Sequence, residues 1–315
     1  MPERTIAGLT AAPGQKVTGW LPVPGVPGAE MPVILIQGAN PGPTLAVTAG
    51  VHGAEYGGIA AASRLAAELD PAAVAGTVVI VPTVNMPAYR ARVAYVVPLD
   101  GKNPNRVFPG SAGGTAAERI AYTLQQEVIR QADALLDLHG GDLVEALVPF
   151  SIYHRSGHPD VDQRSRQLAE AFGIRYVLES AVQGAAYAAA AEAGVPAIIA
   201  EAGQQGIYDP AAAEVHLRGV RNVMRHLGML PGEPERFPIT HMSRFLWIFS
   251  DQEAQWYPGV ACGDLVQKGQ VVGELRDPFG TVLQRCLSPG EGAVLFLVTA
   301  LAVGRGDPLL GIGQE

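Results

Sequence analysis

Residues 44–55 read Thr-Leu-Ala-Val-Thr-Ala-Gly-Val-His-Gly-Ala-Glu, and they carry the clearest structural signal in the chain. The first five residues form a short apolar run, which is typical of a buried strand. The alanine-rich segment 59–69, which ends before Asp70-Pro71, is typical of a helix. The stretch therefore predicts a strand, a glycine-rich turn and a helix in succession.

The turn between them carries His52 and Glu55, which are metal-ligand residue types. Their spacing of three directs both side chains toward one point if a helical turn begins near Ala54. The simpler alternative is a core or capping histidine beside a first-turn carboxylate. The glycines that flank the pair favour a ligand role, because so much glycine at a helix start implies a close backbone approach. A catalytic zinc needs a third protein ligand, which must come from elsewhere in the chain.

Strand-like and helix-like segments alternate as far as about residue 230, which predicts an α/β domain with a parallel or mixed sheet. An initial hairpin is expected from residues 17–23 and 33–37. The other expected strands are 77–84, 134–138, 147–153, 175–178 and 196–200, and the expected helices are 115–131, 160–172, 185–193 and 210–227. After Pro231 the chain changes to short β runs separated by glycines. We therefore expect an α/β domain at 1–235 and a small all-β domain at 236–315.

Composition excludes several classes of protein. The chain has 315 residues, 48% of them hydrophobic and 17% charged, as expected for a globular protein. Its net charge of −8 argues against nucleic-acid binding. The longest apolar stretch, 293–303, is too short to cross a membrane, and the N-terminus lacks a secretory signal pattern. A cytoplasmic location with reduced thiols at Cys262 and Cys286 is expected, although their pairing stays open.

Two further apolar runs end in side chains suited to metal chemistry. Residues 134–138 lead into His139, and residues 196–200 lead into Glu201. Ligands in open α/β sheets bind beyond the carboxyl ends of the strands, so these side chains are expected near His52 and Glu55. His139 is then the third zinc ligand, and Glu201 is a candidate general base. Asp137 is a candidate to orient a ligand, or alternatively a strand-end carboxylate that binds a backbone N–H.

A long irregular segment, 88–114, is expected to be a functional loop, since it combines turn signals with arginines and aromatic residues. Four ordered motifs in the chain resemble those of the succinylglutamate desuccinylase/aspartoacylase family, relatives of the zinc carboxypeptidases. They are Gly-Val-His-Gly-Ala-Glu at 50–55, Asn-Pro-Asn-Arg-Val-Phe-Pro-Gly at 103–110, Asp-Leu-His-Gly at 137–140 and Glu-Ala-Gly at 201–203. The resemblance spans residues 30 to 315 and implies a carboxypeptidase-like mixed sheet flanked by helices.

The resemblance also implies site roles and a reaction. One zinc ion per chain would be held by His52, Glu55 and His139, Glu201 would transfer protons, and Asn105-Arg106 would bind a substrate carboxylate. The family reaction is hydrolysis of the amide bond of a small N-acyl amino acid. One departure is that relatives carry an arginine before the loop aromatic, whereas Ala94 precedes Tyr95 here. Arg92 is the candidate to replace that catalytic arginine.

These observations lead to one principal hypothesis and two alternatives. The principal hypothesis is a zinc amidohydrolase that acts on a small N-acyl amino acid, with no nucleic-acid or membrane partner. The alternatives are a zinc carboxypeptidase with room for an extended peptide, and a binding module that kept the scaffold and lost turnover. The sequence leaves the acyl group, the amine and the oligomeric state open, a homo-oligomer being one option.

Overall fold

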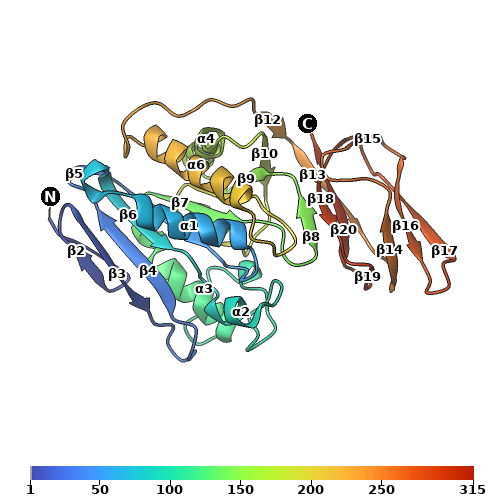
Figure 1. The fold of residues 1–315 in the computed structure, drawn as a ribbon, viewed down its shortest axis with the longest axis horizontal. Helices are drawn as coiled ribbons and strands as arrows, with labels where there is room; N and C mark the ends of the chain where they lie inside the picture. The colour runs from blue at the N-terminus through green and yellow to red at the C-terminus, as the bar shows by residue number, and fades with distance from the viewer. Residues whose placement is uncertain (1) are drawn as a thin grey trace.

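The structure is a computed structural model that describes residues 2–315. A large mixed β-sheet lies between two groups of helices, and an all-β module extends from one end of this body (Figure 1). Among residues 2–315, none of the helices combines the length and the apolar character needed to span a bilayer. Cys262 and Cys286 are both free thiols.

The large sheet has nine strands in the order β12-β10-β9-β11-β7-β5-β6-β4-β3. The four central strands, β11, β7, β5 and β6, run parallel to one another. In sheet order the bounds are Thr240–Met242, Tyr176–Ser180, Phe150–His154, Ala197–Glu201, Ala134–His139, Asn40–Ala49, Ala75–Val81, Met31–Gln37 and Gln15–Leu21.

The central strands are continuous apolar runs because both faces of the sheet are covered. Every residue of β7 is buried, and so is every residue of β6 after Ala75. Parallel strands covered by helices on both faces have this pattern, whereas a half-exposed strand would alternate. The expected strands at 44–48, 77–84, 134–138 and 196–200 are therefore confirmed as the centre of the sheet.

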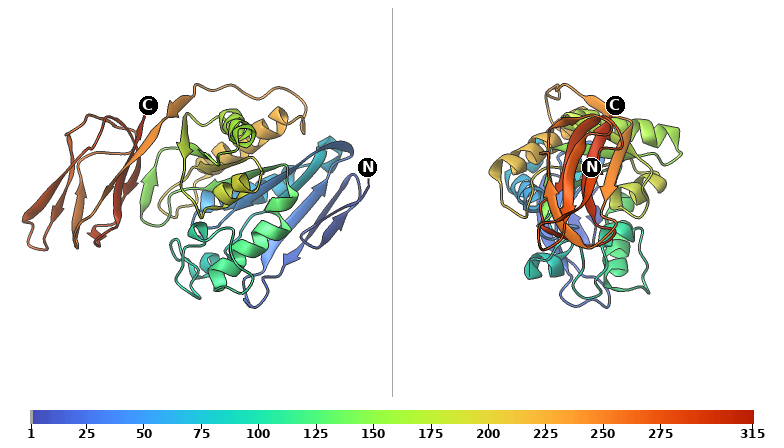
Figure 2. Two further views of the ribbon diagram at one scale, coloured as in Figure 1. Left: turned by 180° about the vertical axis from the view of Figure 1, so that it is seen from behind. Right: turned by 90° about the vertical axis from the view of Figure 1, so that its right-hand side faces the viewer.

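Helices cover the two faces of this sheet separately (Figures 1 and 2). Three helices share one hydrophobic core with the sheet: α1 (Tyr56–Glu68), α4 (Pro159–Phe172) and α6 (Pro210–His226). Two helices pack into the core on the other face: α3 (Ala116–Glu127) and α5 (Ala186–Glu192). The longest, α6, begins at Pro210, where the Asp209 carboxylate accepts the Ala211 N–H at 2.9 Å.

The C-terminal module consists of a five-stranded and a four-stranded sheet around the buried Trp256. The module itself supplies eight of these nine strands: β13 (Arg244–Phe249), β14 (Ala254–Pro258), β15 (Leu265–Val266), β16 (Val271–Arg276), β17 (Val282–Leu287), β18 (Gly292–Val298), β19 (Ala302–Val303) and β20 (Pro308–Gln314). A short strand from the α/β body, β8 (Glu145–Leu147), pairs antiparallel with β18. The module is thus hydrogen-bonded to the body as well as connected to it through the chain.

Two expectations about secondary structure were wrong in detail. The strand expected at 147–153 is split into β8 and β9, which lie in different sheets. Pro149 has no N–H to continue a ladder, and the Val148 N–H donates to Leu295 of the module at 3.1 Å. The loop expected from residue 88 overlaps helix α2 (Met86–Ala91), which begins because the Asn85 side chain accepts the Ala88 N–H.

The division of the chain at residue 235 stays a prediction. Strand β12 follows that boundary and still pairs in parallel with β10 of the large sheet.

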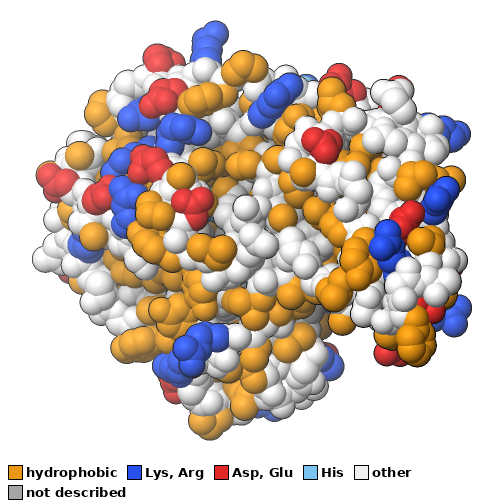
Figure 3. Space-filling model, turned by 45° about the vertical axis from the view of Figure 1, so that its right-hand side comes forward, with side chains coloured by type: hydrophobic (Ala, Val, Ile, Leu, Met, Phe, Trp, Pro, Cys, Tyr) orange, Lys and Arg blue, Asp and Glu red, His pale blue; other side chains and the backbone are white. Residues whose placement is uncertain are grey.

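The face shown in Figure 3 carries Lys and Arg side chains interspersed with Asp and Glu, while apolar side chains run across its centre. A continuous basic surface of the kind that binds nucleic acid does not occur on that face.

The close approach of α1 to β7 generates a prediction about Gly58. A Cβ at Gly58 would lie 2.8 Å from the carbonyl oxygen of Leu138, directly before His139. Helix propensity alone predicts that Gly58→Ala stabilises the protein by about 1 kcal/mol. We expect the opposite sign, a loss of about 1–3 kcal/mol, because the helix must move off the strand. Thermal unfolding measures the difference.

Gly113→Ala is the matched control, because a Cβ at Gly113 would meet no atom within 4 Å. If Gly58→Ala unfolds at or above the temperature of the wild type, the close approach of α1 to β7 does not require a glycine at position 58.

Candidate metal centre and cavity

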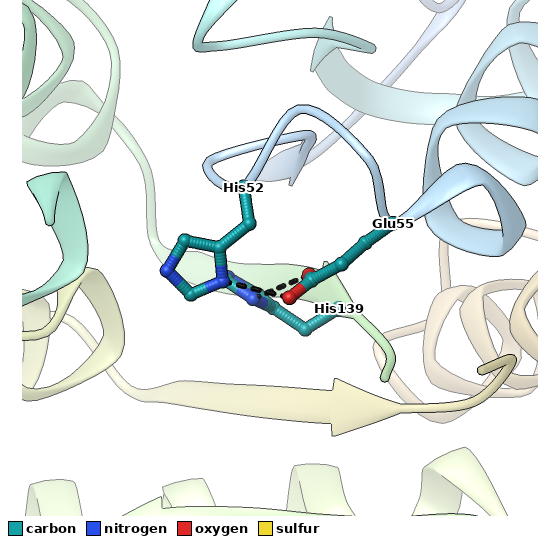
Figure 4. Close-up of side chains that lie close together, drawn as sticks. All are labelled: His52, Glu55 and His139. Atoms are coloured by element: carbon teal, nitrogen blue, oxygen red, sulfur yellow. Dashed lines mark hydrogen bonds and ion pairs between the residues drawn. The ribbon is translucent and has the colours of Figure 1, made fainter. Parts of the chain in front are cut away.

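Three buried side chains converge beyond the carboxyl ends of two neighbouring strands (Figure 4). His52 Nδ1 lies 2.7 Å from one Glu55 carboxylate oxygen, and His139 Nδ1 lies 2.8 Å from the other. One ligand atom from each residue lies within 4.8 Å of the other two. The structure therefore brings together the three residues predicted as metal ligands.

The sequence produces this convergence through strand pairing and a tight turn. Strands β5 and β7 are parallel neighbours, so the turn after Ala49 and the last residue of β7 lie side by side. The turn needs Gly53, because a Cβ there would lie 2.2 Å from the Tyr89 backbone nitrogen. Helix α1 then starts at Tyr56, which leaves Glu55 at its N-cap with its carboxylate toward the histidines.

Outer hydrogen bonds fix which histidine nitrogens face the centre. His139 Nε2 donates to Asp137 at 3.0 Å, and Asp137 also accepts the Thr48 hydroxyl at 2.6 Å. His52 Nε2 donates to the Asn103 side-chain oxygen at 3.0 Å. Because both acceptors bind the Nε2–H, Nδ1 is the nitrogen of each ring that is directed at the centre and that would coordinate a metal ion once deprotonated. Asp137 thus occupies the orienting position expected for it.

The charges of the cluster are strongly coupled. Burial alone would raise the pKa of Glu55, but the charges and hydrogen bonds of His139 and His52 outweigh burial and lower it to about 2. Burial lowers the pKa of His139, whereas Glu55 and Asp137 raise it well above its usual value. The ionised Glu55 carboxylate thus stabilises protonated histidines beside it, and once these rings are deprotonated the three side chains form a donor set suited to a divalent metal ion.

Glu201 is the last residue of β11 and stands in register beside His139 on β7. Its side chain lines the same cavity as the three converging residues. Burial raises the pKa of Glu201 well above its usual value, the charge of His139 acts against this, and the charge of Glu55 adds to it. The structure thus places the expected acid–base carboxylate beside the candidate metal centre.

The loop residues Asn105 and Arg106 also line the cavity. They lie on a short 3₁₀ turn, Pro104–Arg106, in which the Asn103 side chain accepts the Asn105 N–H at 2.8 Å. The Asn105 side-chain oxygen accepts the Ala186 N–H at the start of α5 at 2.9 Å. Asn103 therefore contacts both a candidate metal ligand and the turn that presents the arginine.

Arg92 does not share this location. It is an exposed residue in the left-handed conformation at the end of α2, and among residues 2–315 it is absent from the set that lines the cavity. Its catalytic assignment stays a prediction that the geometry does not support. Arg106 is the one guanidinium among the described residues that line this cavity.

The cavity has a volume of about 270 Å³, and residues of the β module form part of its lining. The module contributes Phe245 and Trp247 from β13 and Phe296 from β18. The ring centroid of Trp247 lies 4.6 Å from that of Phe245 and 5.2 Å from that of Phe296. An aromatic wall, defined here as Phe245, Trp247 and Phe296, therefore faces the candidate metal centre.

A family model for the succinylglutamate desuccinylase/aspartoacylase catalytic domain matches residues 41–227, which contain every converging residue described above. The chain belongs to this family. The N-alpha-acetyl-L-2,4-diaminobutyric acid deacetylase of Halomonas elongata is 31% identical over 259 residues, which cover 79% of this chain and 75% of that relative.

Solved structures of family members extend the likeness to the C-terminal module. The product-bound ectoine utilization protein EutE (DoeB) of Ruegeria pomeroyi superposes with a TM-score of 0.88 at 26% identity, covering 95% of both chains. A succinylglutamate desuccinylase/aspartoacylase from Rhodobacter sphaeroides gives 0.87 at 26% identity with the same coverage. The fold expected from the sequence motifs is thereby confirmed for this family member.

Several cavity residues escaped the sequence motifs of the family. They are Glu145, Glu179, Tyr187 and the aromatic wall, while Asn103 lies inside the motif at 103–110 but was given no role there. Tyr95 was noted only as an aromatic residue of the loop, although its ring stands edge-on to His52 at 6.2 Å. Asn103-Pro104 is a recognisable turn signal, but no local signal marks Glu145, because its position depends on the pairing of β8 with the distant β18.

The hydrogen bonds of Asp137 generate a prediction about metal affinity. Asp137→Asn removes the charge that orients His139, so we expect metal binding to weaken by about 10- to 100-fold. Competition with a chromogenic chelator measures the affinity. Asp133→Asn, at the start of the same strand, is the control, because that carboxylate accepts only a backbone N–H from Thr44 within the described residues. Equal affinities of the two variants would show that Asp137 does not orient a ligand.

Proposed function

We propose that this protein is a zinc-dependent deacylase that hydrolyses the amide bond of a small N-acyl amino acid. The observation that carries the proposal is the convergence of His52, Glu55 and His139 in one cavity, with Glu201 in register beside them. Membership of a family that includes an N-acetyl amino acid deacetylase supports the same reaction class.

The donor set fits zinc better than the common alternatives. Two imidazole nitrogens and one carboxylate are a usual catalytic zinc set, whereas magnesium and calcium prefer all-oxygen sites. Three protein ligands leave a fourth tetrahedral position free. A bound zinc ion supplies Lewis acidity, which lowers the pKa of a water molecule and polarises a carbonyl oxygen.

Glu201 moves the protons of the reaction. As a general base its carboxylate removes a proton from the attacking water, and as a general acid it returns that proton to the leaving nitrogen. Burial and the charge of Glu55 raise the pKa of Glu201, which favours the proton-holding state, whereas a bound zinc cation would lower that pKa and favour the carboxylate needed for the base step. Because strands β7 and β11 are in register, the carboxylate reaches the metal side of the cavity without a flexible loop.

Arg106 is the residue that we assign to the substrate carboxylate. Its guanidinium lines the cavity, and one nitrogen, Nη1, is held by the Asn105 carbonyl oxygen at 2.8 Å. The planar guanidinium offers paired donors that match a carboxylate. Arg92 is left out of the proposed mechanism because its side chain is exposed and lies outside the cavity lining of residues 2–315.

The size of the cavity favours a small substrate over a peptide. A volume of about 270 Å³ is slightly below the usual range of small-molecule pockets, ~300–1,000 Å³. The aromatic wall forms part of this lining, and β8 pairs with β18, the strand that carries Phe296. The carboxypeptidase alternative therefore has no support in the shape of the site.

The role of Glu201 generates a mutational prediction. Glu201→Gln keeps the shape of the side chain but removes its basicity, so we expect kcat to fall by about 10² to 10⁴. Zinc content, measured by elemental analysis, is expected to stay near one per chain. An unchanged kcat would remove Glu201 from the mechanism. Full zinc content of the wild type without hydrolysis across an N-acyl amino acid panel would instead favour the binding-module alternative.

The role of Arg106 generates a second prediction. Arg106→Lys keeps the charge but loses the paired donors, so we expect a higher KM for an N-acyl amino acid. The matched amide without the carboxylate should be affected much less, because it has nothing to dock on the guanidinium. Steady-state kinetics on both substrates measures the two losses. Equal losses would show that Arg106 supports the loop or polarises the scissile carbonyl rather than docking a carboxylate.

A further inference from the structure

We propose that Glu145 is a specificity residue that binds a side-chain ammonium group of the substrate and so selects N-acylated diamino acids, the class to which the substrate named for the Halomonas elongata relative belongs. This inference rests on the proposed deacylase function and names the substrate class of that site. It assigns a specificity role to a residue outside the four family motifs.

The position of Glu145 places its carboxylate inside the cavity. It begins strand β8, and Leu147, two residues later, lies on the same face of that strand and also lines the cavity. The strand is fixed on one side by β18, where Glu145 pairs with Val298 and Leu147 with Phe296. The carboxylate is therefore held on a sheet rather than on a loop, as a specificity residue needs to be.

The hydrogen bonds of Glu145 orient it without neutralising it. One carboxylate oxygen, Oε2, accepts the Asp142 N–H at 2.9 Å. Burial together with the charges of Glu145 and Asp142 raises the pKa of the Tyr95 phenol, which therefore stays protonated beside them. Asp142 in turn accepts the Tyr95 N–H at 2.8 Å, which holds Tyr95 in its left-handed conformation. These contacts fix the position of the Glu145 side chain, which still lines the cavity.

The other carboxylates of the cavity already have roles or partners. Glu55 belongs to the metal centre and Glu201 stands beside it. Glu179 accepts the Tyr153 hydroxyl at 3.1 Å and lies 3.5 Å from Arg155. Within residues 2–315, by contrast, no lysine or arginine forms an ion pair with Glu145.

A poorly solvated carboxylate without a cation is unfavourable, and a cationic ligand removes that cost. Burial raises the pKa of Glu145 to about 7, the Asp142 N–H acts against this, and the charge of Glu55 adds to it. An ammonium group of the substrate would supply the missing positive charge. We therefore assign the cationic partner of Glu145 to a ligand and not to the protein.

The aromatic wall suits the rest of such a side chain. Phe296 belongs to the strand that pairs with β8, and Trp247 and Phe245 continue the cavity lining on β13. Aromatic rings provide apolar contact for the methylene groups of a diamino acid and attract an ammonium group at their faces. With Arg106 for the carboxylate and Glu145 for the amine, the cavity offers one group for each charge of the substrate.

The test compares Nα-acetyl-L-2,4-diaminobutyrate with Nα-acetyl-L-norvaline, which replaces the side-chain ammonium by a methyl group of similar size. The ornithine and lysine homologues cover longer side chains. We expect kcat/KM of the wild type to favour the best ammonium substrate by at least about tenfold, the scale of a charge-assisted hydrogen bond. Glu145→Gln should reduce this preference about 10- to 100-fold.

Glu179→Gln is the matched control, since it removes a cavity carboxylate that already has partners. We expect it to change the preference by less than about threefold, well below one charge-assisted hydrogen bond. If Glu179→Gln loses the preference and Glu145→Gln keeps it, then Glu179 binds the ammonium group and the role proposed for Glu145 is wrong. A wild-type enzyme that hydrolyses neutral or acidic N-acetyl amino acids as well as the diamino ones would refute the inference and leave the deacylase function intact.

A binding measurement tests the role of Glu145 independently of the deacylase function. Calorimetry on zinc-loaded protein compares the free amino acids L-2,4-diaminobutyrate, ornithine and lysine with L-norvaline. We expect tighter binding of a diamino acid to the wild type and loss of the difference in Glu145→Gln. Failure to hydrolyse any member of the panel would refute the deacylase function, while equal binding of diamino acids and norvaline would refute the role of Glu145.

Discussion

The in-register parallel pairing of β5, β7 and β11 is the constraint on which the rest of the site depends. It places the end of β5 beside the end of β7, and it sets Glu201 directly beside His139. The same register puts Thr48 opposite Asp137, whose hydrogen bonds orient His139. A one-residue slip in either pairing would turn a whole set of side chains to the other face of the sheet.

The second organising feature is the contribution of β8 to the sheet of the C-terminal module. Pairing between β8 and β18 converts an appended domain into one wall of the cavity. It also brings Glu145 and the aromatic wall into the lining of the same cavity. Under the proposed function, the α/β sheet would provide the metal ligands, and the module would limit the size and charge of the substrate.

Much of this fold, and the metal centre, could be predicted from the sequence because the relevant signals are local. The apolar runs before His52, His139 and Glu201 reveal buried parallel strands, and such strands meet at one sheet edge. Glu145, Trp247 and Phe296 could not be placed, because their meeting depends on a three-residue strand paired across about 150 residues of sequence. Helix α2 was missed because Asn85-Met86-Pro87 reads equally well as a turn or as a helix start.

The central claim is that the two histidines bind zinc through Nδ1 while their Nε2 atoms remain bonded to Asp137 and Asn103. A crystal structure of zinc-loaded protein, with anomalous data collected at the zinc edge, measures this directly. The account predicts one strong peak about 2.0–2.2 Å from Nδ1 of His52, Nδ1 of His139 and the Glu55 carboxylate, with an open position toward Glu201. A peak elsewhere, or coordination through Nε2, would contradict it.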